Sequence, residues 1–205
     1  MSYKTILEPS VGELTEQRSR FLSFLYPVAN EEAALQQIQS HRQKYWDARH
    51  NVFAYRLFDE SISRFSDDGE PHSTAGKPIL DTLNGAELNN CLLIVTRYFG
   101  GVLLGTGGLV RAYSGAARLA IAAANIVEIR SAVRYRLVTP YPMFDKLSAF
   151  LSAQPAKILS TQFNETVLVE LVVPSEESER FCSALRDAFF NTILPQFVSE
   201  EAFAF

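Results

Sequence analysis

The second part of the chain alternates between the hydrophobic period of strands and that of helices. Alternating or continuous apolar positions predict strands, whereas apolar positions three and four residues apart predict helices. The predicted order is strand, helix, two strands, helix and strand, which is the ferredoxin-like βαββαβ pattern. We find no catalytic motif in this part and expect a docking or structural module. The predicted strands are 131–140, 156–163, 166–174 and 194–203, and the predicted helices are 141–154 and 175–190.

The first part of the chain also mixes both periods. Strands that run together and helices that follow late favour an α+β fold over a doubly wound sheet. Asn30 and the acids after it predict a helix N-terminus, and Gly85 is predicted as the C-terminal cap of a short helix. The apolar run 91–95 predicts a buried strand. The predicted strands are 3–9, 20–28, 50–58 and 91–99, and the predicted helices are 30–45, 77–85 and 107–124.

The distribution of glycine separates the two parts. Nine of the ten glycines lie between Gly69 and Gly115, and none follows Gly115. We therefore expect an α+β protein of two domains, residues 1–130 and residues 131–205.

Composition narrows the class of protein. The net charge of −4 argues against a general nucleic-acid coat, so any site for a polyanion must be a local patch. We find no secretory signal and no apolar run long enough to cross a bilayer. Cys91 and Cys182 lie far apart and outside any CxxC motif. These features predict a cytoplasmic protein that has no disulfide framework and does not bind membranes.

The glycine-rich segment 97–115 leads from a predicted strand into a predicted helix. Backbone amides at a helix N-terminus lack intrahelical partners and lie at the positive end of the helix dipole. Gly105, Gly107 and Gly108 would let a phosphate approach these amides, and Thr106 could supply an N-cap hydroxyl. The alternative is purely structural, because glycines also permit turns and close packing.

The predicted helix after this segment has two faces. Arg111, Ser114 and Arg118 share one face by their spacing, whereas Leu109 and Tyr113 begin an apolar face. The first face could therefore present cations beside the amides of the helix N-terminus.

A second group of polar residues lies in segment 65–78. Asp67, Asp68 and Glu70 surround Gly69, and three carboxylates this close could hold a Mg²⁺ ion. An Asx-turn on a solvated loop explains the same residues and is favoured, because the spacing fixes no fourth ligand. Sequence alone therefore implies no firm cofactor, and magnesium stays open.

Asp47 and His50 form an Asp-x-x-His sequence immediately before a predicted strand. Such an aspartate could orient the imidazole for acid–base catalysis, and a turn with a capping aspartate is the structural alternative. These two residues are the candidate catalytic residues. No Cys–His or GxSxG arrangement supports a nucleophilic mechanism.

Four stretches together resemble the signature blocks of the IMPACT/YigZ family, in the same order. They are RSRF (18–21), DARH (47–50), FSDDGEPHSTAGKP (65–78) and RYFGGVLLGTGGLVRAY (97–113). The resemblance covers residues 1–130, and the second part looks like the small C-terminal domain of bacterial members. His72 falls on a position that the family pattern leaves open, which makes His50 the better catalytic candidate.

The resemblance implies a fold for each part. The first domain is expected to be similar to the second domain of ribosomal small-subunit protein 5 and to the fourth domain of elongation factor G. The second is expected to be ferredoxin-like. Eukaryotic members regulate translation with an additional N-terminal RWD domain that has no counterpart in this sequence. For this chain the resemblance therefore implies only the nucleic-acid or ribosome binding proposed for bacterial members.

Two functions follow as hypotheses. The first is a translation-associated protein that binds RNA or the ribosome through phosphate contacts, with Tyr98 or Tyr113 stacking on a base. The second is a magnesium-dependent enzyme acting on a phosphorylated small molecule, with Asp47 or His50 as base. A structural role for all these blocks is the third possibility. The candidate phosphate- or RNA-binding residues are Arg20, Arg49, Lys77, Arg97, Tyr98, Gly105, Thr106, Gly107, Gly108, Arg111 and Tyr113.

Overall fold

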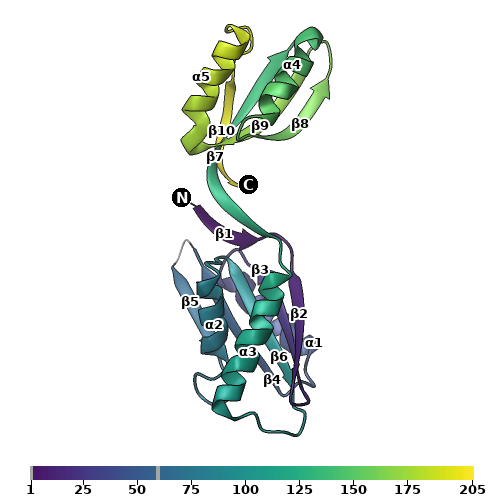
Figure 1. The fold of residues 1–205 in the computed structure, drawn as a ribbon, viewed down its shortest axis with the longest axis vertical. Coiled ribbons are helices and arrows are strands. Elements are labelled where there is room, and N and C mark those ends of the chain that lie inside the picture. Colours follow the sequence, from purple (N-terminus) through teal and green to yellow (C-terminus); the bar gives the residue numbers. More distant parts are fainter. Residues whose placement is uncertain (1, 59–60) are drawn as a thin grey trace. The chain divides into compact units, whose positions relative to one another are not determined.

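The computed structural model describes residues 2–58 and 61–205, and the chain divides into two compact units (Figure 1). One unit is formed by residues 3–127 and the other by residues 128–205 together with Ser2. Each unit has helices packed on an antiparallel sheet, so the predicted α+β class is confirmed. No helix in the described part of the chain is both long and apolar enough to cross a membrane.

The first unit contains a five-stranded sheet in the order β2-β3-β6-β4-β5, with neighbouring strands antiparallel. Strand β6 lies at its centre, as its apolar sequence predicts, and its residues Cys91–Val95 are buried. The elements of this unit are β1 (Ser2–Ile6), β2 (Ser10–Glu16), β3 (Ser19–Pro27), α1 (Glu31–Lys44), β4 (His50–Leu57), β5 (Ile62–Ser66), α2 (Gly76–Gly85), β6 (Cys91–Tyr98) and α3 (Gly105–Ala122).

Both faces of this sheet are covered. Successive side chains of a strand point to opposite faces, and β6 accordingly places Leu93 in the core beneath α2 and α3 and Ile94 in the core beneath α1. Helices α2 and α3 lie together on one face (Figure 1). Helix α3 contributes a row of small side chains, including Ala112, Ala116 and Ala120, which lets its backbone pack closely on the sheet.

The ends of the helices confirm one cap prediction and correct two. The Asn30 side chain accepts a hydrogen bond from the amide of Ala33 at 2.9 Å and caps α1 as predicted. Thr106 is not the N-cap of α3, because the helix already begins at Gly105 and Leu104 occupies the cap position. Gly85 is not the C-cap of α2 either, since it is the last helical residue and Ala86 follows it with an ordinary right-handed conformation.

Strands β2 and β5 are absent from the sequence-based prediction. They are the two edge strands of the sheet, and most of their side chains are partly or fully exposed. Edge strands carry polar residues that blunt further pairing. Their sequences, SVGELTE and ISRFS, therefore lack the continuous apolar pattern that identifies the inner strands.

The second unit has the predicted ferredoxin-like βαββαβ order. Its strands follow the order β10-β7-β9-β8 and are antiparallel, with α4 and α5 packed on one core. Leu147 of α4 and Leu185 of α5 meet Leu171 of β9 in this core. Its elements are β7 (Ile126–Thr139), α4 (Tyr141–Ser152), β8 (Lys157–Phe163), β9 (Val167–Pro174), a 3₁₀ turn (Ser175–Glu177), α5 (Ser178–Phe189) and β10 (Gln196–Ala204).

Candidate functional site

Three segments of the first unit meet where β6 ends. In the sheet register His50, the first residue of β4, pairs with Arg97 of β6. On the other side of β6, Arg20 of β3 pairs with Tyr98. The amide of Arg49 also donates to the carbonyl of Arg97 at 3.0 Å. The sheet therefore brings DARH, RSRF and the start of the glycine-rich segment side by side, although they lie far apart in the sequence.

A buried carboxylate lies at the centre of this region. Glu70 Oε1 accepts hydrogen bonds from Arg97 Nη1 at 2.6 Å and from the Tyr113 hydroxyl at 2.8 Å. The side chains of Glu70 and Arg97 are only 4% and 6% exposed. Burial, reinforced by the neighbouring carboxylate, raises the pKa of Tyr113 far above its usual value, so its hydroxyl remains a donor. Arg97 and Tyr113 are thus held by Glu70, and neither side chain lies on the surface.

Tyr113 therefore cannot stack on a base, contrary to one prediction. Its ring is fully buried and packs edge-on against Phe21 at 5.2 Å between ring centroids. The Arg97 guanidinium is likewise covered by aromatic rings, lying 5.4 Å from the centroid of Phe21 and 5.5 Å from that of Phe99. A direct phosphate contact by Arg97 at an open surface is excluded by this burial.

His50 is oriented by a backbone carbonyl and not by Asp47. Its Nδ1 lies 2.8 Å from the carbonyl oxygen of Asp68, and because a carbonyl only accepts, Nδ1 must carry the hydrogen. Nε2 lies 3.7 Å from Glu70 Oε1. Asp47 instead accepts a hydrogen bond from the Tyr98 hydroxyl at 3.0 Å. The predicted Asp47–His50 pair is therefore wrong.

Asp67 and Asp68 accept hydrogen bonds from backbone amides, and their carboxylates do not gather with Glu70 into the cluster that the magnesium alternative requires. Asp67 accepts hydrogen bonds from the amides of Ser73, Ala75 and Gly76 at 2.8 to 3.1 Å, which caps the start of α2. No group of three His, Cys, Asp or Glu side chains in residues 2–58 and 61–205 could hold a metal ion.

The Asp68 carboxylate binds a different set of partners. It accepts a hydrogen bond from the amide of Asn51 at 2.7 Å and forms an ion pair with Arg42 at 2.6 Å. The three acids that are adjacent in sequence thus face three separate sets of donors. Sequence spacing could not reveal this divergence, because it depends on loop residues with positive φ angles such as Asp68 and Gly69.

A cavity of about 550 Å³, which we call the His50 cavity, lies beside the buried carboxylate of Glu70. Its polar wall includes His50, Glu70 and Arg97, and Arg49 lies at its exposed side. Gly105 and Thr106 bring the first turn of α3 to the same cavity. The remaining walls are apolar and are formed by Pro71, Phe99, Leu103, Leu104 and Leu109.

The glycine-rich segment combines a structural and an exposed part. A Cβ on Gly100 would lie 2.1 Å from the backbone of Arg18, so this position requires glycine for close chain approach. Gly105, Thr106 and Gly107 are exposed in the first turn of α3, which has no side-chain cap. The Arg111 guanidinium lies near Gly107, 3.6 Å from where a Cβ would be. The first turn of α3 therefore offers accessible amides beside a cation.

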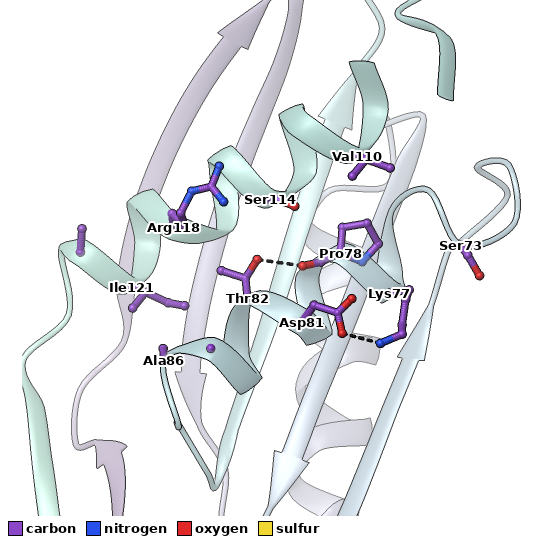
Figure 2. A pocket seen from close by; sticks show the side chains of 12 residues that line it. Ser73, Lys77, Pro78, Asp81, Thr82, Ala86, Val110, Ser114, Arg118 and Ile121 are labelled. Atoms are coloured by element: carbon purple, nitrogen blue, oxygen red, sulfur yellow. Dashed lines mark hydrogen bonds and ion pairs between the residues drawn. The ribbon is translucent and has the colours of Figure 1, made fainter. Parts of the chain in front are cut away.

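Two of the predicted cations are paired elsewhere. Arg20 forms a two-pronged ion pair with Glu13 of the neighbouring strand. Lys77 pairs with Asp81 one turn further along α2 and lines a separate groove of about 820 Å³ between α2 and α3 (Figure 2). Arg118 reaches this groove from α3. Lys77 is thus not part of the His50 cavity, and Arg49 and Arg111 are the predicted cations that stay exposed beside the helix N-terminus.

The structure also adds exposed apolar residues that sequence reasoning overlooked. Trp46 is 81% exposed, and it precedes Asp47, whose carboxylate is bound by Tyr98. Phe99 and Leu103 are 47% and 85% exposed in the segment between β6 and α3. The available signal was the single tryptophan of the chain, lying in a polar stretch where no core pattern requires it.

Comparisons with known proteins match both units. The Impact N-terminal domain model matches residues 17–121, and a domain of unknown function, DUF1949, matches residues 137–190. The chain is 33% identical to IMPACT family member YvyE of Bacillus subtilis, covering 88% of this chain and 83% of that protein. It is 34% identical to IMPACT family member YigZ of Escherichia coli, covering 83% and 85%.

A solved crystal structure of a hypothetical protein supports the fold over nearly the whole chain. That protein is 32% identical to this chain, and the two structures match with a TM-score of 0.61 over 98% of both chains. With the domain match across residues 17–121 and the two bacterial relatives, this shows that the chain belongs to the IMPACT family.

Proposed function

We propose that this protein binds RNA, either free or in the ribosome, through the end of the first unit where β6 runs into α3. The observation that carries this proposal is that the exposed side chains of Arg49 and Phe99 and the first turn of α3 line one cavity. The family is linked to translation regulation in eukaryotes, which makes translation the expected setting. The proposed location is the cytoplasm, in keeping with two buried, unpaired cysteines.

Phosphate contacts are the first part of the argument. Arg49 and Arg111 are exposed, and within the described residues neither forms an ion pair. A phosphate at the first turn of α3 would meet backbone amides at the positive end of the helix dipole. Two free arginines beside that turn supply the charge that a sugar–phosphate backbone requires. A local patch of this kind is compatible with a net charge of −4.

Base stacking is the second part. Proteins that bind single-stranded nucleic acid combine a basic groove with aromatic side chains on which bases stack. Phe99 is exposed in the wall of the His50 cavity, and Trp46 is exposed next to Asp47, whose carboxylate accepts a hydrogen bond from Tyr98. These two rings replace Tyr113 as the stacking candidates.

Fluorescence anisotropy with a labelled single-stranded RNA tests the proposal. We expect affinity that falls linearly with salt on logarithmic axes, and a loss of about ten-fold or more in the double variant Arg49→Glu/Arg111→Glu. The matched control is Arg64→Glu/Arg180→Glu, which makes the same charge change at two exposed arginines outside this region. An equal loss of RNA affinity in both double variants would show that the effect comes from net charge alone, and this would contradict the proposal.

A second assay separates stacking from charge. Trp46→Ala should weaken RNA binding by about 5- to 150-fold without changing the salt slope, because a stacked base contributes about 1–3 kcal/mol. Co-sedimentation with ribosomes at low and moderate salt then shows whether the same residues act on the assembled ribosome. If neither Trp46→Ala nor Arg49→Glu/Arg111→Glu lowers the affinity for RNA, any RNA site lies elsewhere and the proposal is wrong.

An enzyme acting on a phosphorylated small molecule is the second candidate. The observation that favours it is the His50 cavity, which combines a fixed imidazole with nearby amides. Because Asp67 and Asp68 bind the backbone, the magnesium ion of that hypothesis has no carboxylate cluster within the described residues to hold it. The remaining form of this hypothesis is acid–base chemistry at His50.

A further inference from the structure

The His50 cavity contains two hydrogen-bond acceptors that face each other. The hydrogen of the His50 imidazole is fixed on Nδ1 by the Asp68 carbonyl at 2.8 Å, so neutral His50 presents the lone pair of Nε2. The nearest carboxylate oxygen, Glu70 Oε1, lies 3.7 Å away and already accepts from Arg97 and Tyr113. At that distance Nε2 and Oε1 do not share a hydrogen bond. A ligand hydroxyl placed in the cavity would supply the donor that Nε2 lacks.

Because His50 is largely buried, few donors can reach the lone pair of its Nε2. The His50 side chain is only 13% exposed, and the residue lines the cavity. A buried polar group without a partner costs free energy that a suitable ligand recovers. The wall therefore favours a ligand that donates a hydrogen bond to His50 Nε2.

The other walls define the rest of the ligand. Arg49 and the amides of Gly105 and Thr106 provide a positive side, and the Glu70 charge is already balanced by Arg97. Phe99, Leu103 and Leu109 provide an apolar side. A volume of about 550 Å³ lies in the usual range of small-ligand pockets. A nucleotide with a ribose offers a group for each of these walls, namely an anionic phosphate, the flat face of an aromatic base and a hydroxyl donor.

We propose that this cavity holds one ribonucleotide, with the ribose 2′-hydroxyl donating to His50 Nε2, the phosphate at Arg49 and the first turn of α3, and the base against the apolar wall. This inference rests on the proposed RNA binding and adds a means of distinguishing RNA from DNA. The 2′-hydroxyl is the group by which proteins make that distinction. The same chemistry would fit a nucleotide within RNA or a free mononucleotide.

The first test compares a short oligoadenylate RNA with DNA of the same sequence. The native protein should prefer RNA, and His50→Phe should lower the RNA-to-DNA affinity ratio by about 2- to 10-fold, the value of one hydrogen bond. The salt slope should not change. The matched control is His72→Phe, because His72 is 91% exposed and does not line the cavity. Retained folding is checked by circular dichroism for both variants.

The second test uses the unaltered protein. Adenosine 3′-monophosphate and its 2′-deoxy analogue are titrated while the imidazole resonances of His50 and His72 are followed by NMR. The inference predicts that the ribonucleotide shifts the His50 signals and the deoxy analogue does so more weakly, with His72 unchanged. Equal responses to both nucleotides, or none, would overturn the proposed 2′-hydroxyl contact.

The two tests separate this inference from the proposed function. RNA binding with an RNA-to-DNA ratio that His50→Phe leaves unchanged would overturn the cavity assignment and leave the RNA function standing. A His50 response to the mononucleotide without any oligonucleotide binding would assign the cavity to free nucleotides and overturn the RNA function. The absence of oligonucleotide binding together with the absence of a His50 response would overturn both.

Discussion

At the scale of single residues, Glu70 determines how the centre of the first unit is arranged. It is buried, and it holds Arg97 and Tyr113 through one oxygen atom. Removing one partner of a buried ion pair leaves an uncompensated charge and costs about 3–5 kcal/mol. We therefore expect Glu70→Gln to lower the free energy of unfolding by about that amount, measured by urea denaturation.

The control for Glu70 is a glutamate with an ion pair at the surface. Glu87 pairs with Lys4 at 2.7 Å, and both side chains are largely exposed. Exposed pairs are screened by solvent and contribute little. Glu87→Gln should therefore leave the urea midpoint almost unchanged. Similar midpoints for the two variants would show that the Glu70 network contributes nothing beyond a surface pair.

Residue roles were predictable only where a single element determines them. The helical spacing around Tyr113 correctly indicates a buried face, which Leu109 shares. The same spacing does not reveal that the Tyr113 hydroxyl meets a carboxylate 43 residues earlier in the chain. Arg97 illustrates the same limit, since an arginine in a glycine-rich stretch indicates a phosphate contact until its buried partner is known. Polar contacts between distant segments depend on tertiary structure, which sequence periodicity does not encode.

At the scale of elements, helix α2 depends on a cap supplied from outside the helix. Its N-cap residue, Ala75, has no side chain that can accept hydrogen bonds, and Asp67 accepts them instead from Ala75 and Gly76. Loss of a cap typically costs about 0.5–2 kcal/mol. We expect Asp67→Ala to destabilise the first unit by about 1–2 kcal/mol in thermal unfolding, without changing RNA affinity at a temperature where the protein is folded.

A second aspartate near the same helix provides the comparison. Asp81 is exposed on α2 and, among the described residues, pairs only with Lys77 one turn away, an interaction of about 0.2–0.5 kcal/mol. Asp81→Ala should therefore cost much less stability than Asp67→Ala. If Asp67→Ala instead abolished RNA binding at full stability, Asp67 would belong to the binding site and the capping role would be insufficient.

Helix α1 packs on the opposite face of the sheet through a buried histidine. His41 Nε2 lies 2.8 Å from the Thr96 hydroxyl, and Nδ1 lies 3.3 Å from the Tyr26 hydroxyl. Burial, assisted by the charge of Lys44, lowers the pKa of His41 from 6.5 to about 4. The unfolded chain therefore takes up this proton near pH 6.5 and the folded chain only near pH 4. The stability that neutral His41 contributes is complete above pH 6.5 and is lost as the pH falls toward 4.

Urea denaturation of the native protein and of His41→Gln across this range checks the prediction. The native protein should lose more unfolding free energy between pH 6.5 and 4 than the variant, because titrating carboxylates act on both chains alike. His41→Gln should be less stable than the native protein at pH 7, where the imidazole is neutral and bonded. Parallel pH profiles would exclude His41 as the source of the dependence.

The elements themselves were largely predictable, with a clear physical limit. Inner strands such as β6 and β9 are buried on one or both faces, so their apolar runs identify them. The edge strands β2 and β5 are half exposed and polar, and nothing local distinguishes them from loops. The start of α3 was placed two residues late for a related reason. A run containing three glycines has low helix propensity, and its helical conformation is imposed by packing of the following apolar face.

At the scale of the whole molecule, the two units have separate hydrophobic cores. Leu93 belongs to the core of the first unit and Leu171 to that of the second, and both are fully buried. The proposed RNA site is built only from residues of the first unit. Damage to the core of the second unit should therefore lower the stability of that unit and leave RNA affinity unchanged.

Leu171→Ala and Leu93→Ala provide a matched pair for this prediction. Each truncation creates a cavity and should lower the free energy of unfolding of its own unit by about 2–5 kcal/mol. Hydrogen exchange followed by mass spectrometry should show faster exchange confined to residues 128–205 for Leu171→Ala and to residues 3–127 for Leu93→Ala, because local opening follows the weakened core. RNA affinity, measured at increasing temperature, should fall early only in Leu93→Ala. An equal early loss in Leu171→Ala would mean that the second unit contributes residues to RNA binding, and the site would then have to be sought in both units.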